Sequence, residues 1–217
     1  LWGSVPEPYT LYRGVRALPS GHWLRVADGV VGTPQCFDSP LQGLRRVPRA
    51  GADAQAQSLQ QVAEAVRGSV AAHMVADVPV GVFLSAGLDS TMLAACAARV
   101  GELRTLTLGF AEYAGTPLDE AALAGEVALR LKADHRLQRV SAPDFAADRE
   151  ALLAAMDQPS IDGINTWFVA KMAAQQGLKV ALSGIGGDEL FGSYPSFRQV
   201  PRLRRVAAPL ARVPGLG

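Results

Sequence analysis

The sequence predicts an α/β fold in which a parallel sheet is wrapped by helices. From residue 78 onward, short apolar and β-branched runs alternate with segments of helical periodicity. Two of those runs end in loops rich in serine, glycine and aspartate, at 85–91 and 183–188. Hydrophobic residues make up 49% and charged residues 19% of the 217, which is typical of a globular protein. This length accommodates one sizeable domain and part of a second.

The first quarter of the chain has a different character. Residues 9–31 predict short strands and turns, with Gly21 ending a Leu-Pro-Ser-Gly turn. Residues 32–55 are rich in glycine and proline without periodicity, which is typical of a linker between domains. Residues 56–75 carry apolar residues at helical spacing and predict a helix.

The alternating elements follow in order from residue 78. Strands are expected at 78–84, 104–110, 135–140 and 178–183. Helices are expected at 89–100, 118–133, 143–156 and 165–177, and Gly177 closes the last one as its C-cap. No internal repeat interrupts this alternation, so the strands and helices belong to one domain.

The two loops have the composition of an anion site. Small residues at 85–87 let the backbone approach a ligand, and the N–H groups and hydroxyls at the following helix start favour phosphate. Asp89 would repel a bare phosphate, so it predicts a Mg²⁺ ion between carboxylate and phosphate. Asp188 offers a second carboxylate in the later loop. The ordinary alternative is that Asp89 and Ser90 only cap a helix.

Several function classes lose support from the sequence. Neither loop has the G-x-x-x-x-G-K-[ST] pattern, and G-x-G-x-x-G is absent after the first strand. A net charge of +1 argues against a nucleic-acid partner, and the lack of a long apolar run argues against a membrane span. Cys36 and Cys96 form neither a disulfide framework nor a metal motif, so a cytoplasmic location is expected. Cys96 is expected to be a small core residue.

The loops resemble a known family. "DVPVGVFLSAGLDST" (77–91) resembles the S-G-G-x-D-S pyrophosphate loop of N-type ATP pyrophosphatases, with the flanking residues of the glutamine-dependent asparagine synthetases. "LSGIGGDELFGSYPSF" (182–197) resembles the second loop of that family. "LTLGF" (106–110), followed by 119–128 and His135, is similar to its central strand-helix-strand unit. "YRGVRALPSGHWL" (12–24) is similar to the last strands of its glutaminase domain.

The resemblance implies a fold, a domain order and a reaction. It implies an adenine nucleotide alpha hydrolase-like sheet at 56–217, C-terminally truncated, after a glutaminase tail at 1–37 and a linker at 38–55. ATP would adenylate a carboxylate, by family that of aspartate. Pyrophosphate would leave with Mg²⁺, and ammonia derived from glutamine would give asparagine. The expected partners are these small molecules, and the resemblance is compatible with a homodimer.

The resemblance also implies site residues. Asp89 and Asp188 would hold the metal. Leu84 and Leu108 would lie near adenine or ribose, with Ser183 and Gly184 against the nucleotide. The full set expected to bind ATP or pyrophosphate is Leu84, Ser85, Gly87, Leu88, Asp89, Ser90, Leu108, Ser183 and Gly184.

Departures from the family pattern leave alternatives open. Ala86 replaces a glycine, and its methyl group could crowd the phosphate or oppose a positive φ. Ile185 replaces an acidic residue, and 157–167 lacks the arginine expected near aspartate, so the acceptor could be another carboxylate. A non-catalytic nucleotide-binding fragment is the third alternative. No N-terminal cysteine nucleophile is present, so no glutamine hydrolysis is predicted from this chain, and its acceptor site is expected to be incomplete.

The remaining candidates have ordinary interpretations. The three histidines lack metal spacing and are expected to be structural or surface residues: His22, His73 and His135. Trp167 and Phe168 are expected to be core aromatics. A group of arginines near the C-terminus predicts a solvated helix face: Arg198, Arg202, Arg204, Arg205 and Arg212.

Overall fold

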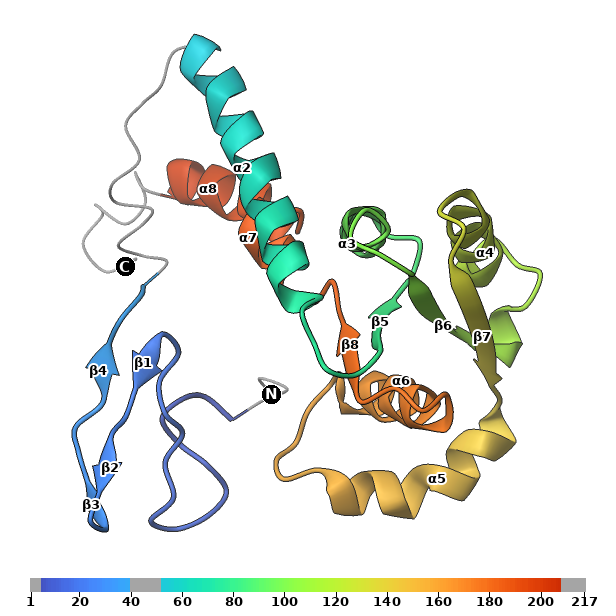
Figure 1. Ribbon diagram of the computed structural model, residues 1–217. Coiled ribbons are helices and arrows are strands. Elements are labelled where there is room, and N and C mark those ends of the chain that lie inside the picture. Colours follow the sequence, from blue (N-terminus) through green and yellow to red (C-terminus); the bar gives the residue numbers. More distant parts are fainter. Residues whose placement is uncertain (1–4, 40–51, 208–217) are drawn as a thin grey trace.

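A four-stranded parallel sheet forms the centre of the molecule, in a computed structural model that describes residues 5–39 and 52–207 (Figure 1). Its strand order is β7-β6-β5-β8. The strands are β5 (Val80–Phe83), β6 (Arg104–Phe110), β7 (Asp134–Val140) and β8 (Val180–Leu182). Every neighbouring pair is parallel. The predicted sheet is therefore confirmed, with strand limits within two residues of those expected.

Helices connect the strands as the periodicity predicts. They are α2 (Ala52–His73), α3 (Leu88–Ala97), α4 (Glu120–Arg130), α5 (Ala142–Ala155), α6 (Gly163–Gln175), α7 (Gly187–Phe191), α8 (Ser196–Ala207) and the 3-10 turn η1 (Ala111–Tyr113). Gly177 follows α6 with a φ of +70°, which confirms its predicted role in ending that helix. The expected helix at 118–133 is shorter because Asp119 caps its start.

The predicted linker holds more structure than its composition indicates. α2 begins at Ala52, inside the expected linker 38–55, and the rest of that linker from residue 40 lies outside the described residues. Earlier, β4 (Gln35–Cys36) pairs antiparallel with β1 (His22–Trp23). β4 therefore lies inside the stretch 32–55 that was interpreted as a linker, because backbone pairing does not require apolar periodicity.

The N-terminal strands form a small antiparallel unit, as predicted for residues 9–31. β2 (Val26–Ala27) pairs with β3 (Val30–Val31) across a two-residue turn. The turn residues Asp28 and Gly29 have φ values of +51° and +75°. Two positive values are the mark of the I′ hairpin turn, for which Asp-Gly is a favoured sequence.

Core side chains divide between the two faces of the sheet. On one face, Val82 and Leu84 pack with alanines of α3 and α4 and with Val70 of α2. On the other face, Leu106 packs with Met172 of α6, and Val140 packs with residues of α5 and α6. Phe168 is buried and Trp167 is half-buried there, so the expectation of core aromatics is confirmed. Cys96 packs against the first cluster, also as expected.

The strand order places the two unusual loops side by side. From β5 the chain moves outward to β6 and β7, and β8 then returns to the opposite side of β5. Because both strands are parallel, their carboxyl ends meet at one edge of the sheet. The order reverses between them, and such a switch point is where open α/β sheets bind ligands.

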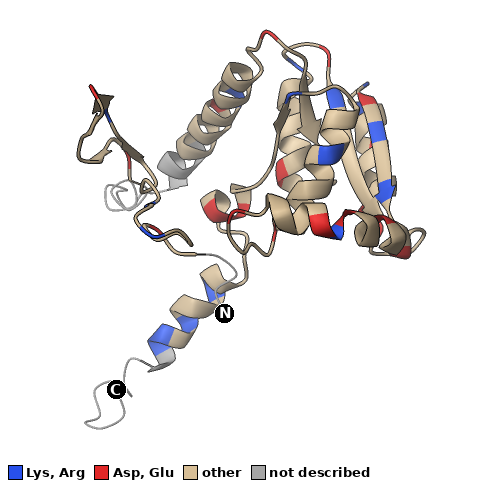
Figure 2. Ribbon diagram, turned by 90° about the horizontal axis from the view of Figure 1, so that it is seen from below, with Lys and Arg blue, Asp and Glu red and all other residues tan. Residues whose placement is uncertain are grey.

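α8 projects away from the sheet and its helices (Figure 2). Four of the five predicted surface arginines lie on it and are exposed, which confirms the solvated face: Arg198, Arg202, Arg204 and Arg205. Arg212 lies outside the described residues. Among the described helices, none combines the length and the apolar character needed to cross a bilayer.

Candidate functional site

The loop after β5 is held in shape by Ser90. The side chain of this residue is buried, at 5% exposure. Its hydroxyl accepts a hydrogen bond from the N–H of Ser85 at 3.2 Å and donates to the carbonyl of Gly87 at 3.2 Å. The two serine Oγ atoms lie 3.0 Å apart. Ser90, predicted as a ligand contact, therefore organises the loop from inside.

Ala86 occupies the strained position of this loop. Its φ is +60°, in the left-handed region that an L-residue enters at a cost of about 1–2 kcal/mol. The sequence analysis identified this position as one where an alanine would oppose a positive φ. The loop nevertheless adopts that φ at Ala86. The Ala86 side chain packs against the first core cluster, so its methyl group gains contacts that a glycine would lack.

The start of α3 presents free backbone donors. Its N-cap is Gly87, and no side chain makes a capping hydrogen bond there. Asp89 therefore lies in the first turn of α3 without making a capping hydrogen bond. Among the described residues, the N–H groups of Leu88 and Asp89 have no hydrogen-bond partner. First-turn N–H groups of this kind are the donors that bind anions at helix N-termini.

The second loop packs directly on this helix start. A Cβ atom at Gly184 would lie 3.1 Å from the Ser90 nitrogen and 3.3 Å from Cβ of Asp89. A Cβ atom at Gly187 would lie 2.5 Å from Cγ of Asp89. Gly184 was expected to lie against the nucleotide. In the direction in which a side chain would extend from either glycine, the space is occupied by the start of α3. The absence of side chains at both positions lets the two loops form one site.

A pocket of about 200 Å³ opens at this junction, between α2, α3 and the second loop. Asp89, Ser183, Gly184 and Gly187 all line it. Val66 and Val70 of α2 and Phe191 of α7 form its apolar side. The structure thus brings Asp89, Ser183 and Gly184 to one cavity, whereas Asp188 is not among the residues that line it.

The two predicted metal ligands have carboxylates available for a cation. Asp89 and Asp188 are half-buried, and within the described ranges neither carboxylate makes a hydrogen bond or ion pair. No cluster of three or more metal-ligating side chains occurs in that part of the chain. Mg²⁺ does not need one, since it is held by one or two carboxylates together with phosphate oxygens and water. The donor set therefore fits Mg²⁺ bound with a phosphate ligand.

The predicted leucines take different positions. The side chain of Leu84 is buried in the core at 1% exposure, and its carbonyl accepts from the Thr107 hydroxyl. Leu108 is half-buried against the third cluster, and Leu88 is exposed. The Ser183 hydroxyl accepts from the N–H of Ile185 at 3.3 Å. Any contact of Leu84 with a ligand is thus limited to its backbone.

Acidic groups surround Tyr194, which the sequence did not single out. Its hydroxyl donates to Glu189 at 3.1 Å, and this hydrogen bond, with the charges of Glu189, Asp188 and Asp162, raises the pKa of Tyr194. Asp162 belongs to the stretch 157–167, which the resemblance associates with the acceptor. That stretch therefore lies near the second loop, a proximity that only the folded chain reveals.

The remaining singled-out positions are accounted for. Ile185 is 85% exposed beside the pocket, and the N–H of Ser193 donates to the carbonyl of Asp188 at 3.1 Å. His22 and His73 each place Nδ1 near a backbone carbonyl, and His135 Nδ1 lies 2.9 Å from the Thr105 hydroxyl. Burial lowers the pKa of His135. All three histidines are structural or surface residues, as predicted.

The sheet and its paired loops define an α/β domain with a switch point at the carboxyl ends of β5 and β8. Residues 61–214 match the family described as Asparagine synthase, so the chain belongs to that family. It is 38% identical over 209 residues to a putative asparagine synthetase [glutamine-hydrolyzing] from Mycobacterium bovis, covering 92% of this chain and 30% of the relative. It is 30% identical over 214 residues to asparagine synthetase [glutamine-hydrolyzing] 1 from Bacillus subtilis, covering 97% and 32%.

The chain thus spans about a third of the length of these relatives. Among solved structures it is similar to an NH3-dependent NAD synthetase from Campylobacter jejuni, with a TM-score of 0.40 and 13% identity. That similarity covers 57% of this chain and 54% of the other.

Proposed function

We propose that this chain is the ATP-pyrophosphatase part of an amide-forming ligase. A carboxylate would be adenylated by ATP with release of pyrophosphate, and ammonia derived from glutamine would then form the amide. The observation that carries the proposal is the contact of Asp89 and the α3 N-terminus with the glycines of the second loop. Membership of the Asparagine synthase family supports the reaction class.

Each part of the site has a role in this reaction. The free N–H groups of Leu88 and Asp89 would bind the leaving pyrophosphate, and Ser90 would keep the loop in the shape that presents them. The carboxylates of Asp89 and Asp188 would hold Mg²⁺. The metal, when bound, neutralises the charge that develops on the leaving group. Because α3 and the second loop pack together, the two carboxylates belong to segments that are in contact.

Aspartate is the acceptor that the family favours, and asparagine would then be the product. A second candidate is an amidotransferase that acts on another carboxylate. It is favoured by Ile185, which replaces an acidic residue of the family pattern and is exposed at the pocket, and by the lack of an arginine in residues 157–167. Both cysteines are free thiols, which is compatible with a reducing cytoplasm. A homodimer remains a further proposal.

Exchange of labelled pyrophosphate into ATP tests the proposal, screened over aspartate and other carboxylic acids. Exchange that depends on one acid identifies the acceptor. Saturable Mg·ATP binding without exchange for any acid would support the nucleotide-binding fragment instead. Asp89→Asn should abolish exchange, whereas Asp134→Asn, an exposed aspartate at the start of β7, should leave it unchanged. Equal exchange by Asp89→Asn and the wild-type chain would refute the metal role.

A further inference from the structure

Beyond the end of β5, the sheet narrows to two strands. β5 ends at Phe83, opposite Leu106, whereas β6 continues beside β7 to the pair Phe110 and Val140. Leu108, expected near adenine or ribose, belongs to this extension. Two paired strands are marginally stable without further packing. On one face, the third core cluster supplies such packing, since Leu108 and Val140 belong to it. On the other face, the extension is held by contacts with α4.

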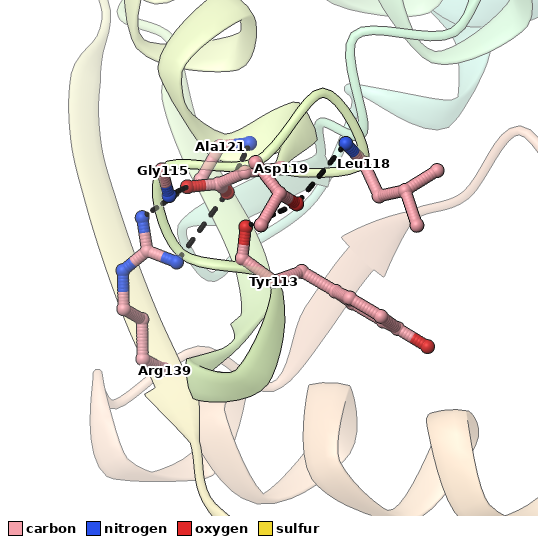
Figure 3. Close-up of polar contacts among 7 residues, drawn as sticks. Tyr113, Gly115, Leu118, Asp119, Ala121 and Arg139 are labelled. Atoms are coloured by element: carbon pink, nitrogen blue, oxygen red, sulfur yellow. Dashed lines mark hydrogen bonds and ion pairs between the residues drawn. The ribbon is translucent and has the colours of Figure 1, made fainter.

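A two-pronged ion pair fixes the extension to the start of α4, as Figure 3 shows. Arg139 of β7 donates from Nη2 to Oδ2 of Asp119 at 2.8 Å and from Nη1 to Oδ1 at 3.3 Å. The Asp119 carboxylate also accepts from the N–H groups of Gly115 and Ala121. We refer to the Asp119–Arg139 pair as the clamp. It joins β7, the turn after η1 and the N-terminus of α4.

Gly109 lets the clamp cross β6. It is the strand partner of Arg139. A Cβ atom at Gly109 would lie 3.3 Å from Nη1 and 3.6 Å from Cγ of Arg139. The arginine side chain therefore passes directly over the backbone of β6, next to Leu108. The clamp therefore contacts β6 at Gly109, the residue that follows Leu108 in the strand.

The clamp makes more hydrogen bonds than the capping of a helix requires. One acceptor oxygen suffices at an N-cap, and an asparagine would supply it. The Asp119 side chain is only 8% exposed and makes four hydrogen bonds. Bidentate arginine–carboxylate pairs fix orientation as well as distance. By contrast, Arg136 meets Asp134 through a single 3.2 Å contact at the exposed beginning of β7.

We infer that Asp119 and Arg139 are positioning residues for the base end of the nucleotide. By fixing the β6–β7 extension, they set the place of Leu108 relative to the first loop. This inference rests on the proposed function. The phosphate end would be held by loops attached to β5 and β8, which the clamp does not touch. Loosening the clamp should therefore weaken contacts to the base and leave contacts to pyrophosphate intact.

Binding of Mg·ATP and of Mg·pyrophosphate by the 217-residue chain separates these two ends. Arg139→Gln and Asp119→Asn should each weaken Mg·ATP binding about tenfold and leave Mg·pyrophosphate binding unchanged. Asp119→Asn retains an oxygen for the Ala121 N–H, so α4 stays capped. Arg139→Lys, which keeps the charge but not the fork, should recover part of the loss. Arg136→Gln is the matched control and should bind both ligands like the wild-type chain.

Two results would overturn the positioning role. One is Mg·ATP binding by Arg139→Gln that equals the wild-type value. The other is an equal loss for Mg·ATP and Mg·pyrophosphate in every clamp variant, including Arg139→Lys, because that would indicate general damage to the fold. If the wild-type chain binds neither ligand, the proposed function fails first, and the positioning role fails with it.

Discussion

The carboxylate of Asp89 lies against the backbone of Gly187, although the two residues come from loops after different strands. A Cβ atom at Gly187 would lie 2.5 Å from Cγ and 3.0 Å from Cβ of Asp89. The contact orients the proposed metal ligand through the second loop. Since β5 and β8 are neighbours, the position of the Asp89 carboxylate also depends on the register in which these two strands pair.

Gly187→Ala should disturb both stability and binding. The added methyl group meets the carboxylate and Cβ of Asp89, and overpacking of this kind costs about 1–3 kcal/mol. The free energy of unfolding in urea should fall by that amount, and Mg·ATP binding should weaken as Asp89 is displaced. Gly125→Ala is the control, because that glycine lies inside α4 with open space around it. It should stabilise the chain by about 0.5–1 kcal/mol. A stable Gly187→Ala chain with unchanged binding would contradict the close contact.

Substitutions at Ala86 should rank by their tolerance of a positive φ. Ala86→Gly relieves about 1–2 kcal/mol of backbone strain. It also loses a half-buried methyl group, worth about 0.8 kcal/mol. The net stability should rise by about 1 kcal/mol or less on these figures. Ala86→Val should be the least stable of the three because a β-branched side chain is strained there. Urea unfolding gives the order, and a valine variant as stable as the glycine variant would contradict the geometry of the loop.

Ser90→Ala should unfold more easily than the wild-type chain. The substitution leaves the N–H of Ser85 without its partner and removes one of the two hydrogen bonds that the carbonyl of Gly87 accepts, while the bond from the Thr91 N–H remains. A buried polar group left unpaired costs about 1–3 kcal/mol. Ser183→Ala is a useful comparison, because its exposed hydroxyl makes a single hydrogen bond to Ile185 and its loss should cost less. Equal stability of the two variants in urea would show that Ser90 does not organise the loop.

His135 should make the fold sensitive to mild acid. Burial lowers its pKa below the ordinary value of 6.5, so the unfolded chain takes up a proton before the folded chain does. The stabilising contribution is complete above pH 6.5 and is lost as the pH falls through the lower, folded value. His135→Gln removes the titrating group and should flatten this part of the stability–pH curve. An unchanged slope in the variant would assign the sensitivity to another group.

Periodicity and turn chemistry predict the parallel sheet, its helices and the two loops, because these features depend on patterns within short stretches of the sequence. The positive φ of Ala86 could be anticipated because the family pattern has a glycine at this position. The start of α2 at Ala52 could not be predicted, since residues 52–55 have no apolar periodicity of their own. The helix begins at Ala52 because these residues continue a helix whose later part packs on the core.

Contacts between segments that are distant in the chain could not be predicted from the sequence pattern. Gly184 and Gly187 have the composition of a ligand-binding turn, and only the folded chain shows that α3 fills the space beside them. The pairing of Asp119 with Arg139 could be found only from the folded chain, in which β6 and β7 are neighbours and the Arg139 side chain passes over Gly109. Likewise, Asp162 joins the surroundings of Tyr194 through the arrangement of α6 and α7.

The strand order has a consequence for the time course of folding. β5, β6 and β7 follow one another in the chain and can pair in that order. Val80 of β5 can pair with Val180 only when β8, which comes much later in the chain, reaches the sheet. Long-range pairing of this kind carries a large loop-closure entropy and is slow. The three residues of β8 at the sheet edge should therefore join last and open first. Pulse-labelled amide exchange should show protection of β6 and β7 before β8, so the site is completed only in the final step of folding.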